Sequence, residues 1–188
     1  SKKVFCRVGT LFSGFSTREP NILLKAYKTY IRPIFDYASN VWSPYHLKYI
    51  NAIERVQRNF TKRIPSLSNL SYAERLAMLD LETLECRRLK ADLTMYYKII
   101  NNLTVFNSST YFEFNVHVRD TRLAADSNSY CINKPFCRTS CFQNDFFQRC
   151  ILCWNSLPNT VVQSSCLKLF KSELNKINLS DFLKYQLL

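Results

Sequence analysis

The sequence predicts a mainly α-helical protein, and three observations lead to this prediction. Only two glycines occur among 188 residues, Gly9 and Gly14, so turns that need a positive φ must be rare after residue 14. Apolar residues recur at helical spacing in several stretches, which Pro, Asn and Ser residues separate. Because 47% of the residues are hydrophobic, the chain can bury a substantial core. We therefore expect a helical bundle followed by a small α-rich lobe.

The first third of the chain contains two predicted helices with basic faces. One helix is expected over residues 19–41, capped by Ser16 or Thr17 and kinked or restarted at Pro33, which lacks an amide hydrogen. The second is expected over residues 46–64. Beside an apolar stripe, each helix carries basic side chains: Lys25, Lys28 and Arg32 in the first, and Arg55, Arg58 and Lys62 in the second.

Each basic stripe has two interpretations. It is either an ordinary solvated helix face or part of a surface that binds a polyanion. The occurrence of two such stripes in consecutive helices favours a shared binding surface. Glu54 lies four residues before Arg58, which is the spacing of an ion pair on a helix.

Two further helices follow. Ser71 and Glu74 have the spacing of a capping box and predict a short helix. A longer helix is expected over residues 83–102. Its first turns contain Arg87 and Arg88, where the helix dipole does not favour cations. A phosphate contact would explain these arginines, and their good helix propensity is the alternative explanation.

The last third of the chain is more varied. Polar residues without a clear period predict a loop-rich linker, after which residues 130–142 can form one or two short strands, at most one short β-hairpin. Helices are expected over residues 143–157 and 167–177, with Cys150, Cys153 and Trp154 of the former facing the core. The expected organisation is a helical region over 1–104, a linker over 105–129 and a C-terminal extension over 130–188.

The charge of the chain indicates a polyanionic partner. Its formal net charge is +12, from 26 Lys and Arg against 14 Asp and Glu. Nucleic acid is the first candidate, an anionic membrane surface the second, and a basic protein without such a partner remains the alternative. No stretch is long and apolar enough to span a bilayer. The start, SKKVFCRVGT, has neither an initiator Met nor a signal-peptide core, so we expect part of a longer, intracellular polypeptide.

The sequence shows no recognisable catalytic motif. No two acidic residues are adjacent, so the paired aspartates that hold magnesium in polymerases are missing from this chain. Cys137, Cys141, Cys150 and Cys153 come close to the spacing of a zinc site. Because Cys150 and Cys153 fall inside a predicted apolar helix, we instead expect reduced, packed thiols and neither a metal nor another cofactor.

Several segments carry a family resemblance. They are LKAYKTYIRPIFDYASNVWSP from Leu24 to Pro44, IERVQRNFTKRI from Ile53 to Ile64, the residues around the Ser71 capping box and Arg87, and RCILCWNSLPNTVV from Arg149 to Val162. In order and with matching gaps, they resemble the part of a non-LTR (LINE-type, jockey-like) retrotransposon reverse transcriptase that follows the polymerase palm. The resemblance covers nearly the whole chain.

The resemblance implies that residues 1–104 form a thumb-like region that grips the backbone of an RNA/DNA template–primer duplex. The magnesium-dependent chemistry would belong to the palm of the parent RNA-directed DNA polymerase, so this chain alone would not be an enzyme. Its partners would be the duplex and the palm and fingers, and not a membrane. The protein would be located in the cytoplasm, in the nucleus or in both. The alternative is a degenerate or domesticated remnant that acts as a protein-interaction module. The expected contacts are Lys25, Lys28, Arg32, Arg55, Arg58, Lys62, Arg87 and Arg88.

Overall fold

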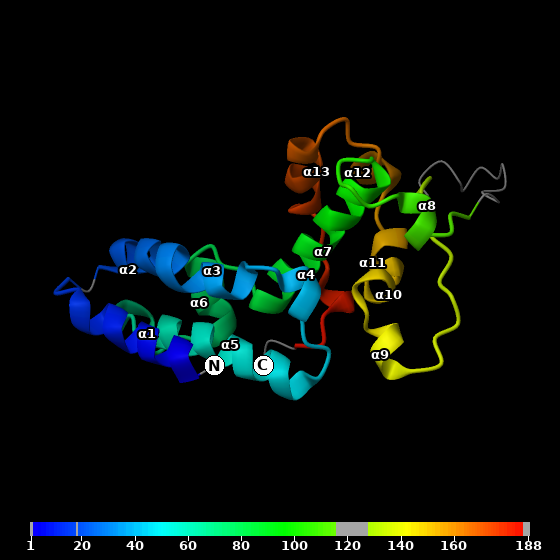
Figure 1. Ribbon diagram of the computed structural model, residues 1–188. Coiled ribbons are helices and arrows are strands. Elements are labelled where there is room, and N and C mark those ends of the chain that lie inside the picture. The colour runs from blue at the N-terminus through cyan, green and yellow to red at the C-terminus, as the bar shows by residue number, and fades with distance from the viewer. Residues whose placement is uncertain (1, 18, 116–127, 186–188) are drawn as a thin grey trace. The chain divides into compact units, whose positions relative to one another are not determined.

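The computed structural model describes residues 2–17, 19–115 and 128–185. The described chain is mainly helical, as the sequence predicts, and Figure 1 shows its helices. Residues 116–127, in the expected linker, lie outside the described residues. No helix within the described ranges combines the length and the apolar character that are needed to cross a bilayer.

The chain forms two compact units, and their boundary differs from the expected one. The first unit comprises Ser1–Arg88 together with Leu183–Leu188, and the second comprises Leu89–Phe182. The division falls inside helix α7 (Leu84–Ile100) and not at residue 104. The reason is that Leu84 packs into the core of the first unit, whereas later residues of the same helix, such as Tyr96, pack into that of the second.

The first unit is built from short and medium helices. Helix α1 contacts both η1 and α5, and α5 also contacts α6, so that the run from α2 to α3 lies alongside α1 in Figure 1. Besides the start of α7, its elements are α1 (Lys2–Gly14), α2 (Pro20–Ala26), η1 (Tyr27–Ile31), α3 (Arg32–Asp36), α4 (Ser39–Trp42), α5 (Leu47–Lys62), η2 (Pro65–Leu67) and α6 (Tyr72–Met78).

The helix expected over 19–41 is interrupted next to Pro33. Proline has no amide hydrogen to donate to the carbonyl four residues before it. The chain forms a π-helical turn, η1, immediately before this position, and the amide of Arg32 donates to the carbonyl of Tyr27 five residues back. The helical path ends before Ala38, whose φ of 49° is left-handed.

The capping predictions have mixed outcomes. The Ser71–Glu74 capping box is confirmed: the Ser71 amide donates to the Glu74 carboxylate at 2.7 Å, and the Glu74 amide donates to the Ser71 hydroxyl at 3.3 Å. The predicted cap at Ser16 or Thr17 is wrong. Glu19 occupies the N-cap position of α2, and Thr17 only accepts a bond from the Glu19 amide, before the helix begins.

Helix α5 confirms the predicted helix over 46–64 but turns Glu54 inward. Glu54 is fully buried, so the expected surface ion pair with Arg58 is wrong. Its carboxylate accepts hydrogen bonds from the Tyr72 hydroxyl and from the Leu84 amide, the latter at 2.9 Å. Burial raises the pKa of Glu54, and the hydrogen bond from Tyr72 partly opposes this rise.

Gln57 extends this buried polar network. Its side-chain oxygen accepts a hydrogen bond from the Tyr27 hydroxyl at 2.8 Å. Its side-chain nitrogen donates to the Tyr72 hydroxyl at 3.1 Å and to the carbonyl of Glu82 at 2.8 Å. The network therefore joins η1, α5, α6 and the segment that leads into α7. The aromatic ring of Tyr27 also stacks on Phe60 within the same core, with ring centroids 4.3 Å apart.

The second unit consists of short helices around an aromatic core. Trp154 and Phe170 are fully buried, and Phe170 stacks on Tyr97 with centroids 4.4 Å apart. Besides most of α7, the elements are α8 (Ser108–Tyr111), α9 (Ser140–Gln143), α10 (Phe146–Arg149), α11 (Ile151–Asn155), α12 (Asn159–Val162), α13 (Leu167–Leu174) and η4 (Ser180–Phe182).

Several expectations for this unit need correction. The short hairpin is reduced, within the described residues, to one antiparallel bridge between Phe114 and Ile132. The helix expected over 143–157 is divided at Cys150 into α10 and α11. The expected linker also contains Phe112, which is buried in the core and is therefore not part of a solvated joint.

A buried ion pair fixes α10 against α7. The Arg149 guanidinium donates two hydrogen bonds to the Asp92 carboxylate, each 2.9 Å long. Burial alone would lower the pKa of Arg149, but the hydrogen bonds and the charge of Asp92 outweigh this effect and raise it. The Asp92 side chain is only 3% exposed, so the pair is shielded from solvent and salt.

Replacing Asp92 by Asn should destabilise the protein by about 3 kcal/mol or more, because it leaves the Arg149 charge buried without its counter-ion. Chemical denaturation measures the loss. Glu173→Gln is the matched control, since it removes the charge of an exposed pair with Lys176 and should cost at most about 1 kcal/mol. Equal losses for the two variants would contradict a special role of the Asp92–Arg149 pair.

The pH dependence of stability should reveal the buried Glu54. A raised pKa means that the folded protein binds the Glu54 proton more tightly than the unfolded chain does. The contribution of Glu54 to stability is therefore full below the ordinary glutamate pKa of about 4.3 and is lost as the pH rises through the raised pKa. In urea unfolding from pH 4 to pH 8, Glu54→Gln should gain stability relative to the parent protein as the pH rises.

Glu74→Gln provides a control of opposite sign. The side-chain and backbone hydrogen bonds of Ser71 lower the pKa of Glu74, so the parent protein should gain stability relative to this variant as the pH rises. If the two variants change in the same direction, the assignment of Glu54 as a buried acid with a raised pKa is wrong.

Candidate nucleic-acid interface

Helix α5 carries the most continuous basic surface among the predicted contacts. Arg55, Arg58 and Lys62 are all exposed. Glu54 is the sole acidic residue in the sequence of α5, and it is buried. The exposed face of α5 therefore carries positive charge without an acidic residue of its own helix, which suits a polyanionic ligand.

Lys48 belongs to this face although the sequence analysis missed it. Lys48, Arg55 and Lys62 are spaced seven residues apart, and seven residues nearly complete two helical turns. The exposed side chains thus form one stripe, about 21 Å long at a rise of roughly 1.5 Å per residue. The seven-residue spacing was the signal that could have identified Lys48. We call Lys48, Arg55, Arg58 and Lys62 the α5 basic stripe.

Arg58 lies at the edge of the stripe and has intramolecular partners. Its guanidinium donates a hydrogen bond to the Tyr185 hydroxyl. It also lies over the rings of Tyr72 and Tyr185, with 5.2 Å and 5.6 Å from the guanidinium carbon to the ring centroids. Arg58 therefore attaches the C-terminal segment to α5, while its exposed part still adds positive charge to the stripe.

Lys25 and Lys28 lie on a different helical run. Lys25 is exposed in the last turn of α2, and Lys28 is partly buried in η1. Leu23 and Tyr27 of the same helical run are fully buried in the core of the first unit and so fix the orientation of this run. Both lysines add to the positive surface of the first unit, without belonging to the continuous stripe on α5.

Arg32 and Arg87 are brought together by a carboxylate. The Arg87 guanidinium donates to Asp36 at 2.8 Å, and Arg32 lies 3.8 Å from the same oxygen of Asp36. Burial, followed by the repulsion from Arg87, lowers the pKa of Arg32. Asp36 partly neutralises both arginines, so they contribute less to an external interface than the sequence suggested. The Arg87–Asp36 pair joins α7 to α3, whereas the Arg32–Asp36 pair lies within α3.

The prediction that Arg88 contacts nucleic acid is wrong, because Arg88 is buried. Only 2% of the residue is exposed, and its guanidinium carbon lies 5.9 Å from the centroid of the Trp42 ring. Its charge also lowers the pKa values of Glu54 and Glu85 against the larger effect of their burial. The cations at the start of α7 are therefore explained by neighbouring carboxylates, and Arg88 cannot face an external phosphate in this conformation.

The cysteines and other potential metal ligands are dispersed. Cys150 and Cys153 are buried, as predicted, whereas Cys141 is exposed and Cys137 is partly exposed. All eight cysteines are free thiols. In the part of the chain that the structure describes, no three His, Cys, Asp or Glu side chains gather into a group that could hold a metal ion. Burial raises the pKa of the Cys150 thiol, which lies 3.5 Å from a carboxylate oxygen of Asp92.

Comparisons with known proteins give limited information. No model of a known protein family matches the chain. Over 104 residues, the chain is 24% identical to an uncharacterized protein of Caenorhabditis elegans, and the match covers 54% of this chain and 52% of that protein. The chain thus spans about half the length of this relative. No solved structure matches significantly, so the resemblance to the reverse transcriptases of non-LTR retrotransposons stays a hypothesis.

Proposed function

We propose that this chain is a non-catalytic module that binds the backbone of nucleic acid, within an RNA-directed DNA polymerase of a non-LTR retrotransposon. The observation that carries the proposal is the α5 basic stripe, since it combines exposure, regular spacing and the absence of acidic neighbours on its own helix face. The resemblance of the motifs around Arg32 and Trp154 to those of such polymerases supports the family named in this proposal. The template–primer duplex would be the ligand, and the palm and fingers of the polymerase would supply the magnesium-dependent chemistry.

The mechanism of binding would be electrostatic and independent of sequence. A duplex carries about one negative charge per 1.7 Å of its length, so a stripe of roughly 21 Å can face several phosphates. Arginine binds phosphate through paired N–H donors and lysine through a mobile ammonium group. Contacts of this kind fix the position of the duplex without reading its bases. The buried face of α5 would keep the stripe rigid.

Exchanging Lys48, Arg55 and Lys62 for Gln should make binding less sensitive to salt. Each lost phosphate contact removes about 0.9 from the slope of log K against log salt, so the slope should flatten by about 2 to 3. The measurement is filter binding or fluorescence anisotropy with an RNA/DNA duplex over a range of salt concentrations. Arg58 stays unchanged because its contacts with Tyr72 and Tyr185 have a structural role.

The matched control removes the same charge elsewhere. Lys134, Lys168 and Lys171 are exposed in the second unit, and their exchange for Gln also lowers the net charge by three. This control should leave the slope almost unchanged. Equal flattening by both triple variants would show that net charge alone governs binding, and it would refute the α5 stripe as the interface.

The alternative function, a protein-interaction module, has one observation in its favour. Tyr37 and Val41 are 82% and 86% exposed next to the partly exposed Trp42, and clustered exposed apolar side chains often mark partner surfaces. Sedimentation at low salt separates the two functions. A stable oligomer together with no RNA or DNA binding would favour the interaction module over the polymerase thumb.

A further inference from the structure

The first unit contains an open hollow between α1 and η1 that the proposed nucleic-acid function does not use. It has a volume of about 400 Å³ and opens to solvent. Its lining comes from α1, from the residue that follows this helix and from η1, so the hollow lies wholly within the first unit. The lining residues are Arg7, Thr10, Leu11, Phe15, Tyr30 and Ile31.

Most of the surface that lines this hollow is apolar. Leu11 and Ile31 are buried in the core of the first unit, and Phe15 is partly buried against the same core. Tyr30, by contrast, is 66% exposed. Within the described residues, no other aromatic ring packs on Phe15 or Tyr30. The hollow therefore offers an aromatic side chain whose apolar surface is still accessible to a ligand.

Arg7 gives the hollow a positive charge. It is exposed, and among the described residues no carboxylate forms an ion pair with it. The sequences of α1 and η1 contain no acidic residue. The Thr10 hydroxyl already donates to the Cys6 carbonyl at 3.1 Å. Arg7 is therefore the charged group of this lining, and a carboxylate placed at its guanidinium would accept charge-assisted hydrogen bonds.

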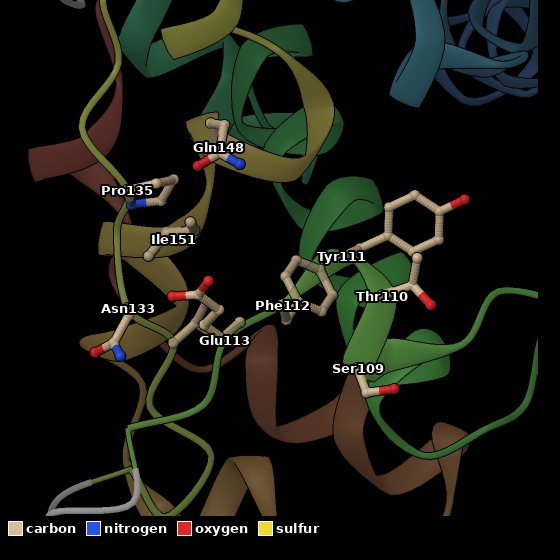
Figure 2. A pocket seen from close by; sticks show the side chains of 10 residues that line it. Ser109, Thr110, Tyr111, Phe112, Glu113, Asn133, Pro135, Gln148 and Ile151 are labelled. Atoms are coloured by element: carbon tan, nitrogen blue, oxygen red, sulfur yellow. The ribbon is translucent and has the colours of Figure 1, made fainter.

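A smaller hollow in the second unit carries the opposite charge. It measures about 170 Å³, and Figure 2 shows Glu113 among the side chains that line it. Among the described residues, no lysine or arginine belongs to this lining. An acidic ligand is therefore repelled there, whereas Arg7 attracts it at the hollow between α1 and η1. The smaller hollow serves as an internal control for the role of charge.

The chemistry of the larger hollow restricts the kind of ligand. A nucleobase or a sugar fits poorly, because its polar edges would lose water against a mostly apolar lining without gaining hydrogen bonds. A cavity of roughly 150 Å³ holds one six-membered ring, so a hollow of about 400 Å³ has room for about two large apolar side chains. An amphipathic helix presents such side chains four residues apart on one face.

Charge complementarity selects an acidic helix over a basic one. The lining carries the Arg7 guanidinium, and the whole chain has a net charge of +12. We propose that the hollow between α1 and η1 binds an acidic amphipathic helix of a partner protein. This helix inserts two apolar side chains against Leu11, Phe15 and Tyr30, and it places a carboxylate at Arg7.

The test measures the binding of two synthetic peptides of about 15 residues, a length at which an isolated helix begins to be stable. Both peptides carry Phe and Leu four positions apart. One has Glu on either side of this pair, and the other has Lys at the same positions. In chemical-shift perturbation of the full chain, the Glu peptide should shift the methyl signals of Leu11 and Ile31 and leave those of Ile132 and Ile151, at the smaller hollow, unchanged. It should bind about tenfold more tightly than the Lys peptide, because repulsion from Arg7 replaces attraction.

Two substitutions, each with a matched control, separate charge from apolar contact. Arg7→Gln should weaken the Glu peptide by about threefold to fivefold and should not weaken the Lys peptide. Its control is Arg55→Gln, which removes the same charge from an exposed position on α5. Tyr30→Ala should weaken both peptides by about fivefold to tenfold, because apolar contact area is lost. Its control is Tyr49→Ala, since Tyr49 is 55% exposed on α5 outside the hollow. Neither control should alter binding.

A third substitution fills the hollow and leaves the core intact. Thr10 is an exposed residue of α1 that lines the hollow, so Thr10→Trp places a large ring in the space that the partner would occupy. Thr and Trp have similar helix propensities, and the thermal unfolding of the variant should therefore resemble that of the parent. Binding of the Glu peptide should be lost.

Several results would overturn the proposal. Equal losses for Arg7→Gln and Arg55→Gln would show that net charge alone attracts the Glu peptide. Binding that Thr10→Trp leaves unchanged would place the partner outside the hollow. Absence of Glu-peptide binding would exclude an acidic helix, and Arg7-dependent binding to vesicles of phosphatidylserine and phosphatidylcholine would then identify an anionic lipid surface instead. The exchange of Lys48, Arg55 and Lys62 should leave peptide binding unchanged, so failure of this proposal and failure of the nucleic-acid proposal are distinguishable.

Discussion

The buried carboxylate of Glu54 is the constraint on which the first unit depends. A charged group in an apolar interior is tolerated only when donors surround it, and here the Tyr72 hydroxyl and the Leu84 amide fulfil this need. The same contacts join α5 to α6 and to the start of α7. Because a helix is rigid, the orientation that buries Glu54 also fixes the side on which Lys48, Arg55 and Lys62 are exposed. The orientation of α5 about its own axis therefore determines both which polar residues are buried and which basic residues are exposed.

Several acidic residues of this basic protein form contacts within the fold. Asp36 holds Arg87 to α3, and Asp92 holds Arg149 to α7. Arg88, close to Glu54 and Glu85, is likewise buried. The chain has 14 acidic residues and 26 basic ones, and several of the carboxylates bind partners within the fold. This arrangement leaves much of the positive excess on exposed lysines, where a polyanion can reach it.

The helical class, the capping box and α5 could be predicted because they depend on local spacing. The burial of Glu54 could not be predicted in this way, because the spacing of apolar residues does not reveal polar residues on a buried helix face. Glu54, Gln57 and Thr61 are such residues. The structural roles of Arg87 and Arg88 were equally hidden, since the Asp36 partner of Arg87 lies 51 residues away.

The C-terminal segment of the first unit has a consequence for the order in which the chain folds. The Tyr185 hydroxyl accepts a hydrogen bond from the Arg58 guanidinium. The backbone amides of Lys184 and Tyr185 both donate to the Glu85 carboxylate. The first unit is therefore discontinuous in sequence, and residues 89–182 leave the ribosome before its last part does. During synthesis the second unit can therefore fold while the first unit still lacks its C-terminal segment. The emergence of residues 183–185, and not the passage of residue 88, then marks the moment at which the first unit becomes complete.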